Sequence, residues 1–364
     1  MNTNEVLMKK CIKLAEKGKG YVSPNPLVGC IIVKEGKIIG KGYHKMFGKE
    51  HAEINAGIDA KKQGYNLKDS TVYVNLEPCS HTGKTFPCTD FLINEKVGKV
   101  VIGMKDPYEK VNGRGIIKLK KAGIDVKSGV LENECRELNR FFVKYVTRHI
   151  PYVTLKVAQS IDGKIALGDY SSKWITGEAS RKFVHKLRSE YDVVLIGRNT
   201  AKIDNPSLTV REVRGRSPYR IVIDRNSTLP ENLKLFSDYH KEKTYSISGI
   251  SKKALTNIYS KNIIKVNEKD QKIVLKDILR KLYSMNISSI LVEGGANLFS
   301  QFIKTGLYDD IYFFIAPKII GKGISSFNNF EIKKIRDSKY FEFVNYKLIE
   351  KDLLLYCRNV HGNN

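Results

Sequence analysis

Apolar and polar residues along the first part of the chain alternate in a way that predicts helices and strands in turn. Leu7, Cys11 and Leu14 recur at helical spacing, and two apolar segments after them flank a Glu-Gly turn, which predicts a helix and then a hairpin. The predicted elements are helices over 4–18, from His51, near Cys88 and over 114–122, and strands over 27–33, 37–43, 71–76 and 100–104. Such alternation is typical of an α/β domain.

The pattern starts again after Pro151. A polar, helix-like stretch over 132–149 ends there, and an apolar strand with an Asp-Gly turn follows. We therefore expect two domains, 1–147 and 148–364, as the length of 364 residues also suggests. In the second domain the pattern predicts strands over 152–158, 192–196, 219–224, 288–292 and 310–316, and helices over 177–189 and 273–285. The second domain is then α/β as well.

Composition narrows the location and the partners. No apolar run reaches the length that a membrane span needs, and the N-terminus lacks the apolar core of a signal peptide, so we expect a cytoplasmic protein without a membrane partner. The six cysteines are then expected to bind metal or to pack, because reducing conditions disfavour disulfides. The net charge of +25 would suit a nucleic-acid partner. The lysines are spread along the whole chain and not gathered on one basic face, so we expect no nucleic-acid partner.

One histidine and two cysteines form a candidate zinc site. His51 opens a His-Ala-Glu triplet, Cys79 follows Glu-Pro after a predicted strand, and Cys88 lies farther along. Zinc favours nitrogen and sulfur ligands, and three protein ligands leave a position for water, as in catalytic sites. Glu53 would not bind the metal but would transfer protons. His-x-Glu followed by Pro-Cys is the signature of zinc deaminases, although their usual spacing is Pro-Cys-x-x-Cys.

Other interpretations of these residues stay open at this point. The cysteines could be buried small side chains, or His44 or His81 could complete a closed structural zinc site. A deaminase acting on tRNA or DNA bases would use the same constellation and the positive charge. A protein that binds a pyrimidine without turning it over is a further alternative, which the intact Glu53 disfavours.

Several motifs together resemble one family over nearly the whole chain. The segments SPNPLVGC (23–30), HAE (51–53) and EPCSHTGKTFPC (77–88) are similar to the bifunctional deaminase-reductases of riboflavin biosynthesis, whose own cysteine spacing is the one seen here. The resemblance implies a cytidine-deaminase-like first domain that removes the 2-amino group of 2,5-diamino-6-(5-phosphoribosylamino)pyrimidin-4-one. Phe86 stands where the family usually has proline. Asn25 is a candidate for contacting the pyrimidine, and His81 and Lys84 for contacting the substrate phosphate.

The second domain lacks a Gly-x-Gly-x-x-Gly motif, so a Rossmann site is not expected. The segment LVEGGANLF (291–299) instead predicts a strand, a Gly-Gly turn and a helix start that would suit a dinucleotide phosphate. The segments 155–166, 171–177 and 199–211 resemble the family's reductase domain, which implies a dihydrofolate-reductase-like fold and reduction of the ribosyl group to ribityl by NADPH.

The resemblance also assigns residues. The implied cofactor positions are Ala158, Trp174, Thr200, Asp204, Gly295, Ala296, Asn297, Leu298, Phe299, Ser300 and Gln301, and the implied substrate positions are Ser172, Arg188, Leu208, Arg211 and Glu293. Arg188 and Arg211 would suit a phosphate. Trp174 could stack near the nicotinamide ribose or belong to the core. Asp204 is the nearest candidate for a proton donor, and the alternative is that it only orients the cofactor. Family relatives form dimers or tetramers, so a homo-oligomer is expected.

Overall fold

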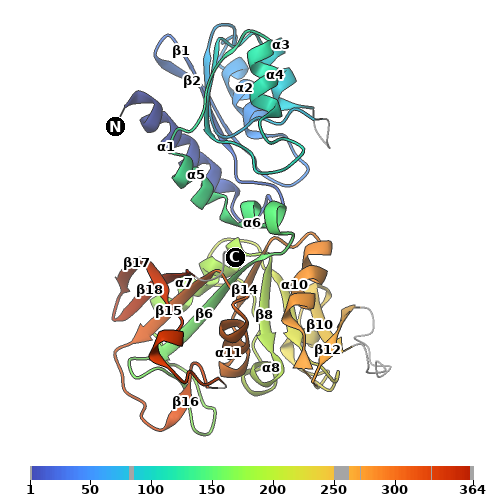
Figure 1. Cartoon of the computed structure of the whole chain (residues 1–364), viewed down its shortest axis with the longest axis vertical. Helices are drawn as coiled ribbons and strands as arrows, with labels where there is room; N and C mark the ends of the chain where they lie inside the picture. The colour runs from blue at the N-terminus through green and yellow to red at the C-terminus, as the bar shows by residue number, and fades with distance from the viewer. Residues whose placement is uncertain (1, 82–85, 250–261, 271, 329, 361–364) are drawn as a thin grey trace. The chain divides into compact units, whose positions relative to one another are not determined.

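The computed structural model describes residues 2–81, 86–249, 262–270, 272–328 and 330–360. It divides into two compact units, Met1–His149 and Ile150–Asn364 (Figure 1). In the described stretches, no helix is long and apolar enough to cross a membrane. The α/β class expected for both halves is confirmed.

The first unit is built on a five-stranded sheet in the order β2-β1-β3-β4-β5. β1 pairs antiparallel with β2 and β3, whereas β3, β4 and β5 run parallel. The strands are β1 (Gly29–Lys34), β2 (Lys37–Tyr43), β3 (Thr71–Leu76), β4 (Lys99–Met104) and β5 (Asp125–Lys127). The helices are α1 (Thr3–Ala15), α2 (Ala52–Lys62), α3 (Cys88–Asn94), α4 (Arg114–Lys121), α5 (Glu132–Leu138) and α6 (Arg140–Arg148), with a 3-10 turn η1 (Glu16–Gly18).

Helices cover both faces of this sheet, which gives three layers (Figure 1). One core joins α2, α3 and α4 to the sheet, and the other joins α1, α5 and α6. Contact between α2 and the hairpin depends on glycine: a Cβ on Gly42 would lie 2.3 Å from the amide nitrogen of Ala56 and 2.4 Å from the carbonyl oxygen of Ala52. The close approach fixes the start of α2, where His51 and Glu53 lie.

The second unit contains a nine-stranded sheet in the order β11-β10-β9-β8-β14-β6-β15-β18-β17. The neighbours from β11 to β15 are parallel, and β18 and β17 are added antiparallel. The strands are β6 (Tyr152–Ser160), β8 (Val193–Gly197), β9 (Tyr219–Ile223), β10 (Thr244–Gly249), β11 (Ile263–Val266), β14 (Ser289–Val292), β15 (Asp310–Ala316), β17 (Phe341–Ile349) and β18 (Asp352–Asn359). Two small sheets pair β7 (Lys164–Leu167) with β16 (Gly323–Ser325) and β12 (Glu268–Lys269) with β13 (Lys272–Ile273).

Helices pack against the large sheet and contribute to its core. They are α7 (Glu178–Glu190), α8 (Arg198–Asp204), α9 (Lys234–Ser237), α10 (Leu275–Ser284) and α11 (Ala296–Thr305), with 3-10 turns η2 (Lys241–Lys243) and η4 (Ile335–Asp337). Apolar faces of α10 and α11 meet the central strands in one cluster, in which Leu279 and Phe302 are fully buried. This packing aligns α11 with the end of β14, next to the candidate cofactor site.

The predicted strands and helices of both halves are confirmed, with small shifts at their ends. The helix-like stretch over 132–149 is instead two helices, α5 and α6, which meet at Asn139. The Asn139 side chain accepts a hydrogen bond from the backbone N–H of Leu27 at 2.7 Å and donates to its carbonyl oxygen at 3.0 Å. This long-range contact holds Asn139 outside helical geometry, which no local pattern could indicate.

Candidate active sites

The three predicted zinc ligands lie together in the first unit. His51 stands at the N-cap of α2, Cys79 follows β3, and Cys88 is the first residue of α3. His51 Nδ1 lies 3.3 Å from the Sγ of Cys88 and 3.6 Å from the Sγ of Cys79, and all three candidate ligand atoms lie within 4.8 Å of one another. Nitrogen and sulfur ligands on a tetrahedral zinc would be about 3.6 Å apart. The donor set and its spacing fit zinc.

The electrostatics of the site favour a thiolate at Cys79. A hydrogen bond from Cys88, with a further contribution from His51, lowers the pKa of the Cys79 thiol to about 4, although burial opposes this. The backbone N–H of Cys88 also points to the Cys79 sulfur at 3.4 Å. The same hydrogen bond, followed by burial, raises the pKa of Cys88, so the two sulfurs favour a single thiolate, and a bound zinc ion would supply the charge that stabilises the second.

Glu53 lies in the first turn of α2 and is 3% exposed. Burial raises the pKa of its carboxyl group, partly offset by the nearby charge of His51. Glu53 is not one of the three side chains that converge as ligands. A buried carboxyl group with a raised pKa, next to a metal site, is suited to accept and return a proton near neutral pH.

Of the three candidate substrate residues of this unit, Asn25 is connected to the metal site by contacts between side chains. The amide Nδ2 of Asn25 lies 3.2 Å from Nε2 of His44, whose other ring nitrogen lies 3.1 Å from the carbonyl oxygen of Glu50. The His44 ring in turn meets the His51 ring edge-on, with 5.3 Å between centroids. Asn25 is thus connected to the metal site through His44.

The loop between the two cysteines holds the other two candidates. His81 packs edge-on against Tyr108, with 6.3 Å between ring centroids. Lys84 lies outside the described residues.

Sequence reasoning missed Glu77, which anchors the segment that carries Cys79. Its carboxylate is buried and accepts four backbone hydrogen bonds, from the N–H groups of Asp106, Gly113, Gly115 and Ile116, at 2.9–3.1 Å. These bonds tie the end of β3 to the start of α4. An acidic residue directly between an apolar strand and Pro-Cys was the one available signal.

The second unit contains a large cavity of about 1170 Å³. It is lined by almost all the predicted reductase residues: Ala158, Ser172, Trp174, Arg188, Thr200, Asp204, Leu208, Arg211, Glu293, Gly295, Ala296, Asn297, Leu298, Phe299 and Gln301. Ser300, the remaining predicted residue, is not among the residues that line this cavity. Its side chain is buried and accepts a hydrogen bond from the backbone N–H of Asn328. Its placement therefore favours a structural contact over a cofactor contact.

A buried ion cluster forms one wall of the cavity. Nε and Nη2 of Arg188 donate to the two carboxylate oxygens of Glu293 at 2.6 and 2.9 Å, and Lys156 Nζ lies 3.3 Å from the same carboxylate. Although burial alone would raise it, the charges of Arg188 and Lys156 lower the pKa of Glu293 to about 2. Sequence reasoning missed Lys156, a charged residue within the apolar strand β6.

Asp204 differs from Glu293 in its electrostatics. It is the last residue of α8, and Ser172 Oγ donates to its Oδ1 at 3.4 Å. Burial raises the pKa of Asp204, with partial opposition from Ser172 and from the charges of Lys173 and Lys156. Of these two carboxyl groups in the cavity, Asp204 holds a proton more readily.

The turn between β14 and α11 matches the predicted Gly-Gly cradle. Gly295 is the N-cap residue of the ten-residue helix α11, and its N–H donates to Oγ1 of Thr200 at 3.0 Å. A Cβ on Gly294 would lie 2.7 Å from the Leu298 side chain and 3.2 Å from the amide nitrogen of Gly197. A Cβ there would displace the end of the Leu298 side chain and crowd the Gly197 backbone, so glycine favours the close packing of this turn, and the N-terminus of α11 lies in the cavity wall.

Trp174 is 62% exposed, so the alternative that it belongs to the core is wrong. Its ring lies at the cavity, and the guanidinium of Arg181 stacks over it at 4.4 Å from the ring centroid. A side chain in this position can stack against a bound ligand.

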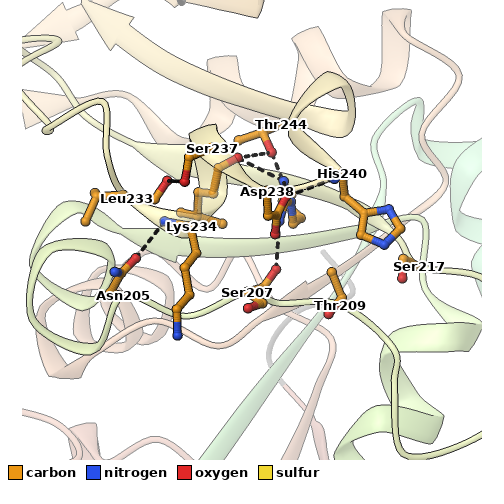
Figure 2. Close-up of polar contacts among 12 residues, drawn as sticks. Asn205, Ser207, Thr209, Ser217, Leu233, Lys234, Ser237, Asp238, His240 and Thr244 are labelled. Carbon is orange, nitrogen blue, oxygen red and sulfur yellow. Dashed lines mark hydrogen bonds and ion pairs between the residues drawn. The ribbon is translucent and has the colours of Figure 1, made fainter.

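A buried arginine next to the cavity holds the loop that carries Leu208. Arg220, on β9, is 1% exposed, and its guanidinium donates to both carboxylate oxygens of Asp238 at 2.6 and 2.8 Å and to the carbonyl oxygen of Ser207 at 2.9 Å. Figure 2 labels Ser207 and Asp238, and beside them Asn205, whose side chain accepts a hydrogen bond from the backbone N–H of Lys234 in α9 at 2.8 Å. Leu208 follows with φ of +54°, so the anchored loop sustains a backbone conformation that leucine rarely adopts.

His185 connects the same region to α7. It is buried, and its Nδ1 accepts a hydrogen bond from the backbone N–H of Arg211 at 3.3 Å. Burial, followed by the charges of Arg188 and Arg211, lowers the pKa of His185 to about 4. The ring is therefore neutral in the folded protein near neutral pH, and protonation of Nδ1 would break its hydrogen bond.

This arrangement predicts a pH dependence of stability. Between the ordinary histidine pKa of 6.5 and about 4, the unfolded chain binds a proton at His185 that the folded protein does not. The stabilisation is thus complete above pH 6.5 and is lost as the pH falls towards 4. We expect the thermal midpoint of the native protein, measured by calorimetry from pH 7 to 4.5, to fall more than that of His185→Gln. Equal falls would show that the folded ring is protonated like a free histidine.

Comparison with known proteins gives matches to both units. Residues 1–104 match the family model described as the cytidine and deoxycytidylate deaminase zinc-binding region, and residues 151–355 match the RibD C-terminal domain. The riboflavin biosynthesis protein RibD of Aquifex aeolicus is 41% identical, over 96% of this chain and 97% of that protein, and RibD of Escherichia coli is 34% identical, over 97% and 98%.

Solved structures are similar over the full length as well. The diaminohydroxyphosphoribosylaminopyrimidine deaminase/5-amino-6-(5-phosphoribosylamino)uracil reductase of Thermotoga maritima is 39% identical with a TM-score of 0.88, covering 98% of each chain. Acinetobacter baumannii RibD, in one crystal form, is 32% identical with a TM-score of 0.89, covering 98% of this chain and 99% of that chain.

Proposed function

The chain belongs to the RibD family of bifunctional deaminase-reductases of riboflavin biosynthesis, and from this premise we propose which residues carry out each reaction. Its first part has the cytidine-deaminase-like fold and its second part the dihydrofolate-reductase-like fold of this family. It deaminates 2,5-diamino-6-(5-phosphoribosylamino)pyrimidin-4-one and then reduces the ribosyl group of the product to ribityl with NADPH. We assign deamination to residues 1–147 and reduction to residues 148–364.

The convergence of His51, Cys79 and Cys88 is the observation that supports the deaminase assignment most directly. These three side chains hold zinc, which when bound lowers the pKa of water towards neutrality. Glu53 accepts one proton from the attacking water and delivers it to the ring nitrogen, then accepts the second proton of that water and delivers it to the departing amino group, so that ammonia leaves and the oxygen stays on the ring carbon. Asn25, oriented by His44, contacts the pyrimidine edge.

In the second unit, NADPH supplies the hydride when bound. Thr200 and the N-terminus of α11 hold the cofactor, and Trp174 stacks at the cavity mouth. Arg188, Arg211 and Ser172 bind the substrate, and Glu293 keeps Arg188 and Lys156 in position through its carboxylate. Asp204, whose pKa is raised, donates the proton that accompanies reduction.

The binding partners and the cellular location are proposed from the composition of the chain and the state of its cysteines. The enzyme acts on small molecules, and we assign it no nucleic-acid partner because its lysines are spread along the chain. All six cysteines are free, which suits the reducing cytoplasm. We also propose that the chain forms a homo-oligomer.

Metal analysis of single variants tests the zinc assignment. Cys79→Ser and Cys88→Ser are each expected to lose most of the zinc, from about one ion per chain, because a hydroxyl is a poor replacement for a thiolate. Cys11→Ser is a matched control. The buried thiol of Cys11 donates a hydrogen bond to the carbonyl oxygen of Tyr73, and a serine hydroxyl can donate the same bond. Mass spectrometric metal content that stays full in both ligand variants would contradict the assignment.

A further inference from the structure

An irregular segment of the second unit carries two of the proposed substrate residues. Residues 205–211 lie between α8 and β9 and belong to no helix or strand. Within them, Leu208 and Arg211 line the cavity. The backbone groups of such a segment have no ladder partners, so other groups of the fold have to bind them. The shape of this part of the substrate site therefore depends on the groups that bind the backbone of 205–211.

Four side chains bind the backbone of this segment. Ser207 and Thr209, which Figure 2 labels, lie on either side of Leu208 in the chain. The distances from donor to acceptor are between 2.9 and 3.3 Å for the four pairs: Arg220 with the carbonyl oxygen of Ser207, Arg188 with the carbonyl oxygen of Thr209, Ser217 with the N–H of Val210, and His185 with the N–H of Arg211. Every residue from 207 to 211 other than Leu208 thus has a backbone group bound by a side chain.

Helix α7 supplies two of these four side chains. His185 and Arg188 are three residues apart, so they lie on the same side of the helix. Farther along, the chain stays close to α7: a Cβ on Gly215 would lie 2.5 Å from the Cβ of Ser189. The position of Arg211 is therefore set relative to Arg188, the other arginine proposed to bind the substrate.

The ring of His185 faces two consecutive residues, Arg211 and Glu212. It is 3% exposed. Because Nδ1 accepts the hydrogen bond from the Arg211 N–H, the ring proton is on Nε2, which lies 4.0 Å from Oε1 of Glu212. The Arg211 side chain stays 57% exposed at the cavity, with its Nε 3.5 Å from the same Glu212 oxygen. The ring thus binds the backbone of Arg211 and leaves its guanidinium accessible to a ligand.

We propose that His185 is a positioning residue for the reduction, which holds the Arg211 guanidinium at the site of the substrate phosphate through its hydrogen bond with the Arg211 N–H. The proposal rests on the assignment of Arg211 to the substrate. His185 then contacts neither the transferred hydride nor the proton, so its hydrogen bond contributes to substrate binding and not to the chemical step. Loss of the acceptor should raise KM for the substrate and leave kcat nearly unchanged.

Three substitutions of His185 test this role. His185→Leu and His185→Phe remove the acceptor, and His185→Asn keeps it, because the amide oxygen of asparagine can take the place of Nδ1. In reduction of 5-amino-6-(5-phosphoribosylamino)uracil by the full chain, we expect the first two variants to raise KM by about tenfold with kcat changed less than about twofold. KM for NADPH should stay native, and His185→Asn should return KM for the substrate to within about threefold of the native value.

A double variant shows whether His185 acts through Arg211. Arg211→Leu alone is expected to raise KM for the substrate by about 10²-fold, because it removes a charged partner of the phosphate. In that background His185→Leu should cause no further increase, since the group that it positions is gone. Lys182→Leu is the matched control, because this side chain is exposed on α7 one turn from His185 and should leave both KM values native. Circular dichroism and ammonia release check that each variant is folded.

The outcomes separate this proposal from the function proposed above. A native KM in Arg211→Leu would overturn the assignment of Arg211 to the substrate, and the role of His185 with it. If Arg211→Leu raises KM, the positioning role alone is overturned by any of three results: native KM in both His185→Leu and His185→Phe, an increase that His185→Asn does not reverse, or an equal increase from His185→Leu with and without Arg211. A fall in kcat at native KM would also overturn it, because that result would place His185 in the chemical step.

Discussion

Replacement of Glu53 by glutamine is expected to slow ammonia release by about 10³-fold while the protein keeps its zinc. Glutamine has nearly the same shape but cannot accept and return a proton. Because Glu53 is not among the three converging ligand side chains, the substitution leaves the metal site intact. Reduction of the deaminated intermediate, supplied directly, should proceed at the native rate, since that reaction uses a different unit.

Ammonia release, zinc content and NADPH oxidation, measured on the same preparation, check this expectation. Glu35→Gln is the control, because it makes the same chemical change at an exposed residue in the turn between β1 and β2. Loss of zinc from the Glu53 variant would mean that the carboxylate holds the metal site together. Retention of deamination would assign the proton transfer to another group.

Replacement of Arg188 by alanine is expected to damage the reductase and to leave the deaminase active. The side chains of Arg188 and Glu293 are 12% and 4% exposed, so the substitution leaves a buried carboxylate with Lys156 as its remaining cationic partner among the described contacts. Loss of one partner from such a pair costs about 3 kcal/mol or more. We expect kcat/KM for reduction to fall by at least about 10²-fold, and the second unit to unfold at lower denaturant concentration.

Steady-state kinetics of both reactions and urea unfolding measure these effects. Lys186→Ala lies on the same helix α7 with an exposed side chain, so it removes a positive charge without disturbing the cluster. An equal loss of deamination in the Arg188 variant would show that the two units depend on each other. A native kcat/KM for reduction in that variant would show that Arg188 does not bind the substrate.

The zinc site could be predicted from sequence because its chemistry is local. His51, Glu53 and Cys88 lie at helix starts, and Cys79 follows a strand. Each residue therefore belongs to an element that the apolar pattern already indicates, and few other chemistries use this set of side chains. The family resemblance then added the cysteine spacing and the reductase residues, most of which lie around one cavity.

The supporting residues could not be predicted, because their partners are distant in sequence. Glu77 binds backbone groups at 106–116, and Arg220 binds Ser207 and Asp238 through side-chain and carbonyl contacts that depend on the tertiary fold. Lys156 did carry a signal, since a charge within an apolar strand needs a partner.

The strand β17 also went unpredicted, although its alternation of apolar and polar residues is typical of a strand. What the sequence could not indicate is its place at the edge of the sheet. That place depends on β15, β18 and β17 pairing in an antiparallel order after a series of parallel strands.

The most direct test of the account follows both reactions in one mixture of full-length protein, zinc, NADPH and 2,5-diamino-6-(5-phosphoribosylamino)pyrimidin-4-one. Ammonia release and the fall in NADPH absorbance are recorded separately. We predict one ammonia per NADPH oxidised at completion, with ammonia released before NADPH is consumed. In Glu53→Gln, both signals should disappear and NADPH oxidation should return when the deaminated intermediate is added. Deamination of RNA bases with neither signal from the pyrimidine would contradict the account.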